Sequence, residues 1–206
     1  MIKMLHFVQH DRISAKNNEK DNNNSSVAPY RSRSICAGRK ERENMKLLSI
    51  AIPSYNSEGF MRNCIESLLP GGEEVEIIIV NDGSKDGTGA IADEYAAKYP
   101  TIVKAVHQEN GGHGEAVNAG LRNATGLYYK VVDSDDWVNE EAYLKILKKL
   151  AELVKSGDMV DMFISNYVYE KEGKKRKKVM QYRTAFPTDQ VFTWDDVKFL
   201  HVGQYI

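Results

Sequence analysis

The sequence is poor in cysteine and proline and contains no long apolar run. Two Cys and five Pro occur among 206 residues. Cys36 and Cys64 show neither a Cys-x-x-Cys pair nor a zinc-ligand spacing, so we predict free thiols and no disulfide framework. No run approaches the 18 apolar residues of a membrane-spanning helix, and the first ten residues lack the apolar stretch of a signal peptide. We therefore expect a cytoplasmic location.

Charge of either sign is not in excess, but it is unevenly distributed. The chain has 28 Lys and Arg against 29 Asp and Glu, yet residues 1–44 carry a net +4 and residues 45–206 a net −5. The first segment has no sustained apolar period and is rich in Asn, so it cannot bury enough surface to offset its ordering entropy. We predict that residues 1–44 are a disordered or extraneous extension and that residues 45–206 form one domain. An acidic domain argues against nucleic acid as a partner.

From Leu47 onward, short β-rich runs alternate with amphipathic stretches, which predicts an α/β fold with helices flanking a mostly parallel sheet. We expect strands at 47–53, 75–80, 101–107 and 126–133. We expect helices at 58–69, 87–98, 114–123 and 140–155, with Ser57 capping the first and Asn139 capping the last. The alternation then stops, and segments 159–170 and 179–186 predict a β-hairpin.

Ligands of open α/β sheets bind at the carboxyl ends of the strands, so the loops after the four strands are the candidate site. The first loop, IPSYNSEG, places Pro53 and Tyr55 at a strand end. In the second, VNDGSKDGT, Asp82 ends a buried apolar strand, where an ionised carboxylate is costly unless something binds it. The acidic spacing of this loop resembles a calcium loop, but a strand precedes it where a helix is required, which excludes that interpretation.

The third and fourth loops suggest a phosphate and a cation. The segment HQENGGHGEAVNAGL enters a helix through a glycine-rich turn, where backbone N–H groups can receive a phosphate. It matches neither the dinucleotide-binding nor the P-loop pattern. The segment VVDSDDW puts three carboxylates in four positions after an apolar strand, and Mg²⁺ or Mn²⁺ is their natural neutraliser.

In this order, SIAIPSYN, VNDGSKDGT, ENGGHGEAVNAGL and VDSDDW resemble the family 2 glycosyltransferases of GT-A fold. The resemblance implies inverting transfer of a sugar from a nucleoside-diphosphate donor, most often a UDP-sugar, to a hydroxyl of a glycan or lipid-linked acceptor. It also implies that Pro53 and Tyr55 pack around the base. Asp82 would accept a hydrogen bond from the base, and Asp133 would contact the nucleoside. The full set implied to bind the nucleotide sugar is Pro53, Tyr55, Asn56, Glu58, Asp82, Gly114, Asp133 and Ser134, with Asp135 holding the metal and Asp136 as its helper.

Two features depart from the family pattern. Val117 stands where many relatives carry Arg, and the resemblance leaves two interpretations of His113, a partial substitute for that Arg or a solvated residue of the glycine turn. The family's general base lies well downstream of the Asp-x-Asp motif, and only 71 residues follow Asp135. Asp189, Asp195 and Asp196 are available, but the segment TWDDVKFL predicts a helix start where Asp caps. We therefore expect the base beyond Ile206, in a longer transferase of which this chain is the donor-binding part.

Other interpretations remain open at this stage. The basic run at 173–178 predicts a soluble hairpin tip, and peripheral contact with anionic lipid is its alternative. The alternative function is a non-catalytic nucleotide-binding module of related α/β fold. A receiver-like module would need an acidic pair after the first strand, where Ser54 and Tyr55 stand instead.

Overall fold

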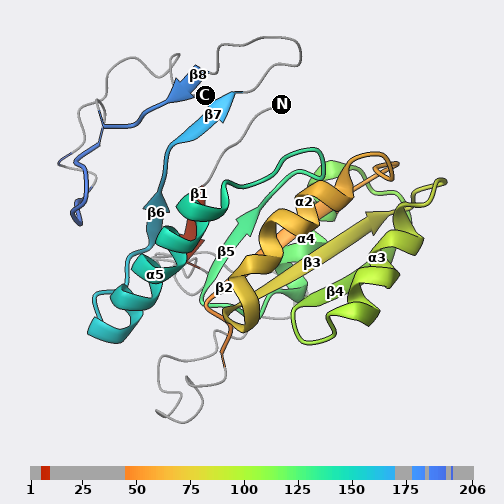
Figure 1. Cartoon of the computed structure of the whole chain (residues 1–206), viewed down its shortest axis with the longest axis horizontal. Helices are drawn as coiled ribbons and strands as arrows, with labels where there is room; N and C mark the ends of the chain where they lie inside the picture. The colour runs from red at the N-terminus through yellow and green to blue at the C-terminus, as the bar shows by residue number, and fades with distance from the viewer. Residues whose placement is uncertain (1–5, 10–44, 170–177, 184–185, 194–195, 197–206) are drawn as a thin grey trace, which may run out of the picture.

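The structure, a computed structural model, describes residues 6–9, 45–169, 178–183, 186–193 and 196 (Figure 1). Its main feature is a six-stranded sheet in the order β4-β3-β2-β5-β1-β6. The strands are β1 (His6–Gln9), β2 (Leu48–Ser54), β3 (Val75–Asp82), β4 (Val103–Gln108), β5 (Tyr128–Val131) and β6 (Met162–Ile164). Strands β2 to β5 pair in parallel, which confirms the predicted α/β class with a mostly parallel sheet.

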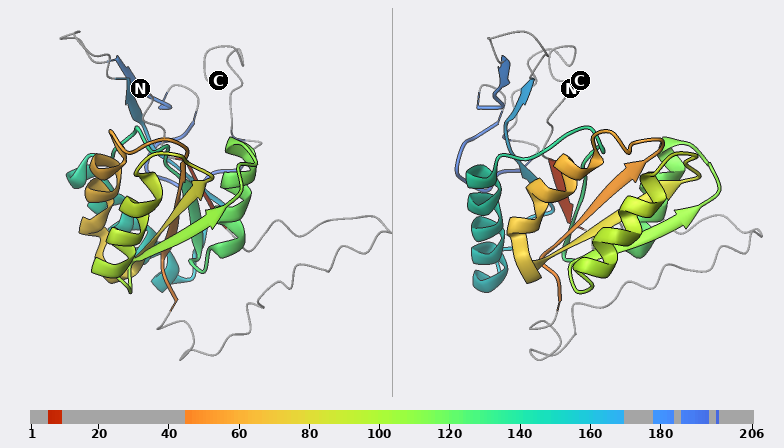
Figure 2. Two further views of the ribbon diagram at one scale, coloured as in Figure 1. Left: turned by 90° about the vertical axis from the view of Figure 1, so that its right-hand side faces the viewer. Right: turned by 45° about the vertical axis from the view of Figure 1, so that its right-hand side comes forward.

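Helices cover both faces of this sheet (Figure 2). They are α2 (Met61–Leu68), the 3₁₀ helix η1 (Leu69–Glu74), α3 (Thr88–Lys98), α4 (His113–Asn123) and α5 (Glu140–Ser156). The alternation of side chains along β3 divides the core, because Ile77 and Ile79 join the cluster that includes α2, α3 and α5. Ile78 and Val80 pack instead with α4.

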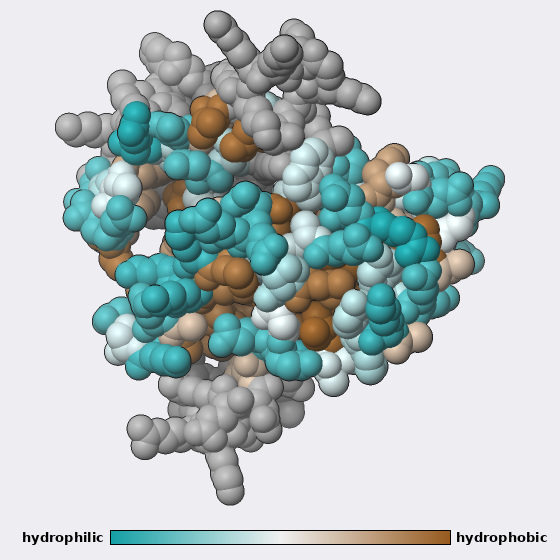
Figure 3. Space-filling view, in the orientation of Figure 1, coloured by the Kyte–Doolittle hydropathy of each residue, from teal (hydrophilic) through white to brown (hydrophobic). Residues whose placement is uncertain are grey.

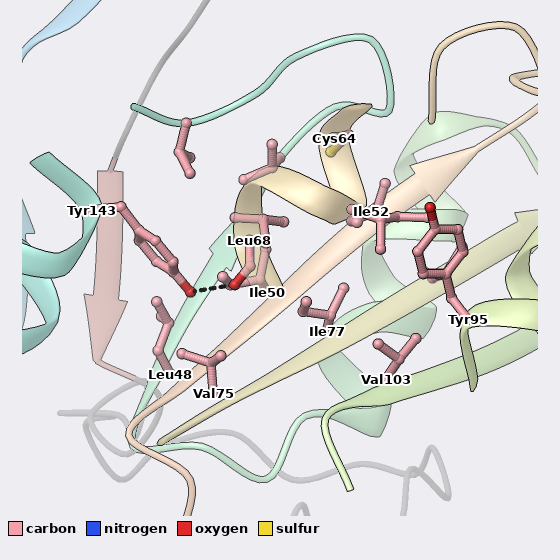
Figure 4. Close-up of a cluster of buried hydrophobic side chains, with 14 of the residues drawn as sticks. Leu48, Ile50, Ile52, Cys64, Leu68, Val75, Ile77, Tyr95, Val103 and Tyr143 are labelled. Atoms are coloured by element: carbon pink, nitrogen blue, oxygen red, sulfur yellow. Dashed lines mark hydrogen bonds between the residues drawn. The ribbon is translucent and has the colours of Figure 1, made fainter. Parts of the chain in front are cut away.

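The larger apolar cluster also contains one polar contact that ties α5 to α2. The hydroxyl of Tyr143 donates a hydrogen bond of 3.2 Å to the carbonyl oxygen of Leu68 (Figure 4). On the other face, α4 lies unusually close to β2. A Cβ atom on Gly120 would fall 2.5 Å from the Cβ of Ala51, so only glycine permits this separation.

The starts of the helices only partly match the predictions. Asn139 caps α5 as predicted, since its side chain accepts a hydrogen bond of 3.0 Å from the N–H of Ala142. The prediction for Ser57 was wrong, because α2 begins at Met61 and no side chain caps it. The carbonyl oxygen of Ser57 closes the preceding turn, while its hydroxyl contacts a different loop, as described below.

Strand β1 is the main departure from the predicted organisation. Its residues, 6–9, lie within the segment predicted to be disordered or extraneous, yet they form a strand between β5 and β6 and antiparallel to both. The prediction rested on the lack of an apolar period and on the Asn-rich composition of residues 1–44. Backbone groups on two neighbouring strands can hold a short segment of almost any composition, and that contribution leaves no pattern in the sequence. Residues 10–44 lie outside the described residues.

The C-terminal part contains a second, small sheet. Strands β7 (Tyr167–Tyr169) and β8 (Lys178–Met180) pair antiparallel, as the predicted hairpin requires, whereas β6 joins the large sheet instead. Apart from the backbone of Lys178, the basic run lies outside the described residues. On the face shown in Figure 3, hydrophilic side chains dominate the described surface and apolar ones show between the helices. In the described part of the chain, no helix is long and apolar enough to cross a bilayer.

Candidate functional site

The candidate site is the edge of the sheet where the four parallel strands β2 to β5 end (Figure 1). Because these strands run in the same direction, the loops that follow them emerge at this edge. The first and fourth loops are joined directly: the hydroxyl oxygens of Ser57 and Ser134 lie 2.8 Å apart, and both side chains are buried. The structure therefore brings together segments that the sequence places far apart.

The first and second loops are joined by Asn56. Its backbone is left-handed (φ 50°), a conformation that Asn tolerates better than most residues. Its N–H donates a hydrogen bond of 3.0 Å to the hydroxyl of Ser84, and its side-chain oxygen accepts one of 2.9 Å from the N–H of Lys85. The polar groups of Asn56 thus fix the tip of the second loop.

Glu58 strengthens the same junction. Its carboxylate accepts a hydrogen bond of 2.5 Å from the N–H of Gly87, and its own N–H donates to the carboxylate of Asp86 at 3.2 Å. Asn56 and Glu58 were expected to touch the nucleotide sugar. The structure shows their polar groups holding two loops together, a positioning function that residue type and spacing did not indicate, and contact with the nucleotide sugar stays a prediction.

Asp82 lies at the end of β3 and closes the glycine turn of the third loop. It is 2% exposed, and its carboxylate accepts hydrogen bonds from the side chain of Gln108 (2.7 Å) and the N–H groups of Gly111 (2.8 Å) and Gly112 (2.9 Å). Burial alone would raise the pKa of Asp82, but these three donors outweigh it, so that its pKa is lowered and the group is ionised. A nucleobase could donate a hydrogen bond to this carboxylate only in addition to the three donors that already bind it.

The accessible groups at this edge come from three loops. Tyr55, predicted to pack around a base, is 50% exposed after β2, whereas Pro53 is buried within that strand. Gly114 in α4 is exposed, and nothing lies within 4 Å of where its Cβ would be, so a ligand can approach the backbone there. Asp133 and Asp135 are exposed after β5, while Ser134 between them is buried.

The carboxylates after β5 do not form a ready-made metal centre. Among the described residues, no three Asp, Glu, His or Cys side chains are grouped to hold an ion. The exposed carboxylate of Asp135 nevertheless fits a Mg²⁺ or Mn²⁺ ion, because such ions usually take one or two protein carboxylates and complete their shell with water and substrate phosphate oxygens. The residues therefore fit an ion that arrives with a diphosphate rather than one held by protein alone.

Of the downstream acids, the two that the structure describes give no candidate for a general base. Asp196 accepts hydrogen bonds from the N–H (2.9 Å) and hydroxyl (3.0 Å) of Thr193, and these bonds lower its pKa; the helix that it was predicted to cap lies outside the described residues. Asp189 lies exposed in a turn with φ 57°. Asp195 lies outside the described residues.

Comparison with known proteins tests the resemblance to the family 2 glycosyltransferases. The family model described as glycosyl transferase family 2 matches residues 49–203. The chain belongs to this family. Relatives include EpsH of Bacillus subtilis, 40% identical over 126 residues, which cover 61% of this chain and 35% of EpsH. The glycosyltransferase GlyG of Streptococcus pneumoniae is 37% identical over 124 residues, which cover 59% of this chain and 39% of GlyG.

These matches span little more than a third of the relatives' own length. Among solved structures, S. aureus TarS 1-349 in complex with UDP-GlcNAc is 32% identical, with a TM-score of 0.46, over 52% of this chain and 31% of that one. The family-model match alone confirms the resemblance that the four loop motifs predicted, at the level of the family 2 glycosyl transferases.

Proposed function

We propose that this chain is the donor-binding part of an inverting glycosyltransferase that uses a nucleoside-diphosphate sugar. The observation that carries the proposal is the convergence at one sheet edge of an exposed tyrosine, an open glycine at a helix start and two exposed carboxylates. Membership of the glycosyl transferase family 2 supports it. The donor is a UDP-sugar, and the acceptor is a hydroxyl of a glycan or of a lipid-linked molecule.

Each accessible group has a role in this proposal. Tyr55 offers its ring to one face of the base, and Asp133 accepts hydrogen bonds from the nucleoside. Asp135 holds Mg²⁺ or Mn²⁺ against the diphosphate, and the ion, when bound, offsets the negative charge that develops on the leaving group. Asn56 and Glu58 support these groups by holding the first and second loops together, and Asp82 does so by holding the glycine turn of the third.

The reaction is a single displacement. The acceptor oxygen bonds to the anomeric carbon as the bond from that carbon to the diphosphate oxygen breaks, and a general base removes the proton of the acceptor hydroxyl. Attack from the side opposite the leaving group inverts the configuration. No described residue is assigned as this base.

Calorimetry with UDP, GDP and CDP, each with and without Mn²⁺, tests the proposal. We expect metal-dependent binding of UDP, with the metal-dependent part lost in Asp135→Ala. Asp158→Ala is the control, because Asp158 is an exposed carboxylate just beyond α5. Failure of all three nucleotides to bind would overturn the proposal. Binding of UDP by a longer natural chain that transfers no sugar would favour a non-catalytic nucleotide-binding module.

A further inference from the structure

His113 lies at the candidate site but has no role in the function proposed above. It is the first residue of α4, and 67% of its side-chain surface is exposed. Its Nε2 atom lies 3.9 Å from the Oδ1 atom of Asp133, which belongs to the loop after β5. The imidazole therefore faces the acidic segment from across the site, on the side where the glycine-rich loop meets the helix.

The glycine-rich loop itself has fewer free donors than its sequence suggests. The N–H groups of Gly111 and Gly112 both donate to the carboxylate of Asp82, so they are not available to a phosphate. Val117, one turn further along α4, has an apolar side chain, and its carbonyl oxygen accepts a hydrogen bond from Tyr129. A diphosphate at this edge would therefore be met by groups beyond these two glycines, such as the open backbone at Gly114 and the imidazole of His113.

The negative charge of the acidic loop also favours a hydrogen-bond donor on the α4 side of the site. Asp133 and Asp135 are both exposed on the opposite side of the site and would repel a diphosphate. A divalent ion on Asp135 offsets part of this repulsion, but it approaches the diphosphate from the acidic side alone. Hydrogen bonds to phosphate oxygens are charge-assisted and about twice as strong as neutral ones, so a single well-placed donor has a measurable effect.

We infer that His113 donates a hydrogen bond from Nε2 to the diphosphate of the donor nucleotide, and that Asp133 holds the imidazole at this edge before the nucleotide binds. The inference rests on the proposed function and adds a residue to it. Two observations support this inference: the open space in front of Gly114, the next residue, leaves room for a ligand, and the contact with Asp133 shows that the imidazole faces the acidic loop. The diphosphate would lie between α4 and the acidic loop.

The plain alternative is that His113 and Asp133 form only a surface contact. Exposed ion pairs contribute little to stability, and 3.9 Å is long for a direct hydrogen bond. This alternative and our inference differ in one measurable way. If His113 only makes a surface contact, replacing it should not affect the binding of UDP more than that of uridine. If His113 donates a hydrogen bond to the diphosphate, replacing it should weaken the binding of UDP alone.

The test compares UDP with uridine, each in the presence of Mn²⁺, by calorimetry on the full chain. We expect His113→Gln to weaken UDP binding about tenfold and to leave uridine binding unchanged. His113→Lys, which restores a charged donor, should recover most of the loss. The matched control is His107→Gln, because His107 also pairs with an aspartate (Nε2 to Oδ1 of Asp93, 2.9 Å) but on the α3 side of the sheet.

The outcomes separate this inference from the proposed function. If the unaltered chain binds UDP and His113→Gln binds it equally well, the inference is overturned while the proposed function stands. An equal loss for UDP and uridine would also overturn it, because it would indicate a general disturbance of the loop. If the unaltered chain binds no nucleotide, the proposed function fails and the inference fails with it.

Discussion

Ser57 and Ser134 share a hydrogen bond between hydroxyl oxygens 2.8 Å apart, although 77 residues separate them in the chain. Each belongs to a different loop of the candidate site, and each is buried, so water does not readily replace either partner. The bond therefore couples the loop that carries Tyr55 to the loop that carries Asp133 and Asp135.

The first prediction concerns this bond. Ser57→Ala and Ser134→Ala should each lower the free energy of unfolding by about 1 kcal/mol, because each leaves a buried hydroxyl without its partner. The double variant should cost less than the sum, as expected for residues in direct contact. Urea denaturation measures all three, with the exposed Ser156→Ala as control. Additive losses would show that the hydroxyls do not interact.

The second prediction concerns Gly83, which has φ 68° and adjoins Asp82. A Cβ there would fall 2.7 Å from the backbone nitrogen of Asn110, so Gly83→Ala adds a clash to the conformational penalty. Gly157→Ala is the matched control, because Gly157 is also left-handed (φ 83°) but has open space before it. We expect about 1 kcal/mol of destabilisation at Gly157 and at least twice that at Gly83.

Thermal unfolding of the two variants, measured in parallel, checks this difference. Equal losses would mean that the chain at Asn110 moves away without cost. We also expect Gly83→Ala alone to weaken nucleotide binding, since Asn110 lies in the loop that Asp82 holds.

The third prediction concerns the pH dependence that Asp82 confers. Its pKa is lower in the folded chain than in the unfolded one, so its stabilisation is complete above the ordinary Asp pKa of about 3.9 and is lost as the pH falls through the lower, folded-state value. Asp82→Asn should cost about 1–3 kcal/mol at neutral pH, because its amide hydrogens would face the donors of the glycine turn.

Urea denaturation at pH 6 and pH 3 tests this assignment. The difference between the unaltered chain and Asp82→Asn should shrink as the pH falls, whereas the exposed control Asp158→Asn should show little difference at either pH. A difference that stays constant across this range would contradict it.

The fourth prediction concerns Lys130, which is 4% exposed in β5. Burial lowers its pKa to about 8, although Asp133 and Asp136 oppose this shift. Between pH 8 and the unfolded-state pKa of about 10.4, the unfolded chain binds the proton and the folded chain does not, so this group makes stability rise with pH. Lys130→Met should remove that rise.

The measurement is the free energy of unfolding from pH 7 to pH 10, expressed as the difference between variant and unaltered chain. Lys145→Met is the control, since Lys145 is an exposed lysine of α5. Tyrosines titrate near the upper end of this range in all three chains, so subtracting the unaltered chain and comparing the result with that for Lys145→Met isolates the contribution of Lys130. An unchanged slope in Lys130→Met would show that Lys130 keeps its ordinary pKa.

The parallel sheet and its helices could be predicted because their signals are local. The near-continuous apolar run of β3 is typical of a strand buried on both faces, and it is buried as expected. The cap of α5 follows from one residue, Asn139, at the right place. The acidic segment after β5 and the glycine-rich turn were likewise visible as motifs, and they lie at one edge of the sheet.

The work of individual residues within the site could not be predicted, because it depends on partners distant in sequence. Ser57 is a plausible cap by residue type, but its hydroxyl reaches the loop after β5 instead. Asn56 and Glu58 stand beside Tyr55, and only the folded chain shows that they bind the second loop. These contacts join residues 29 positions apart, and no local pattern in the sequence marks them.

The position of β1 has a consequence for the order of folding. Its partners, β5 and β6, begin more than 110 residues later in the chain. During synthesis from the N-terminus, His6–Gln9 must therefore wait until residues 162–164 have emerged before both of its edges are paired. Contacts of such long sequence separation form slowly. We expect the parallel strands to assemble first and β1 to be the last to join the sheet.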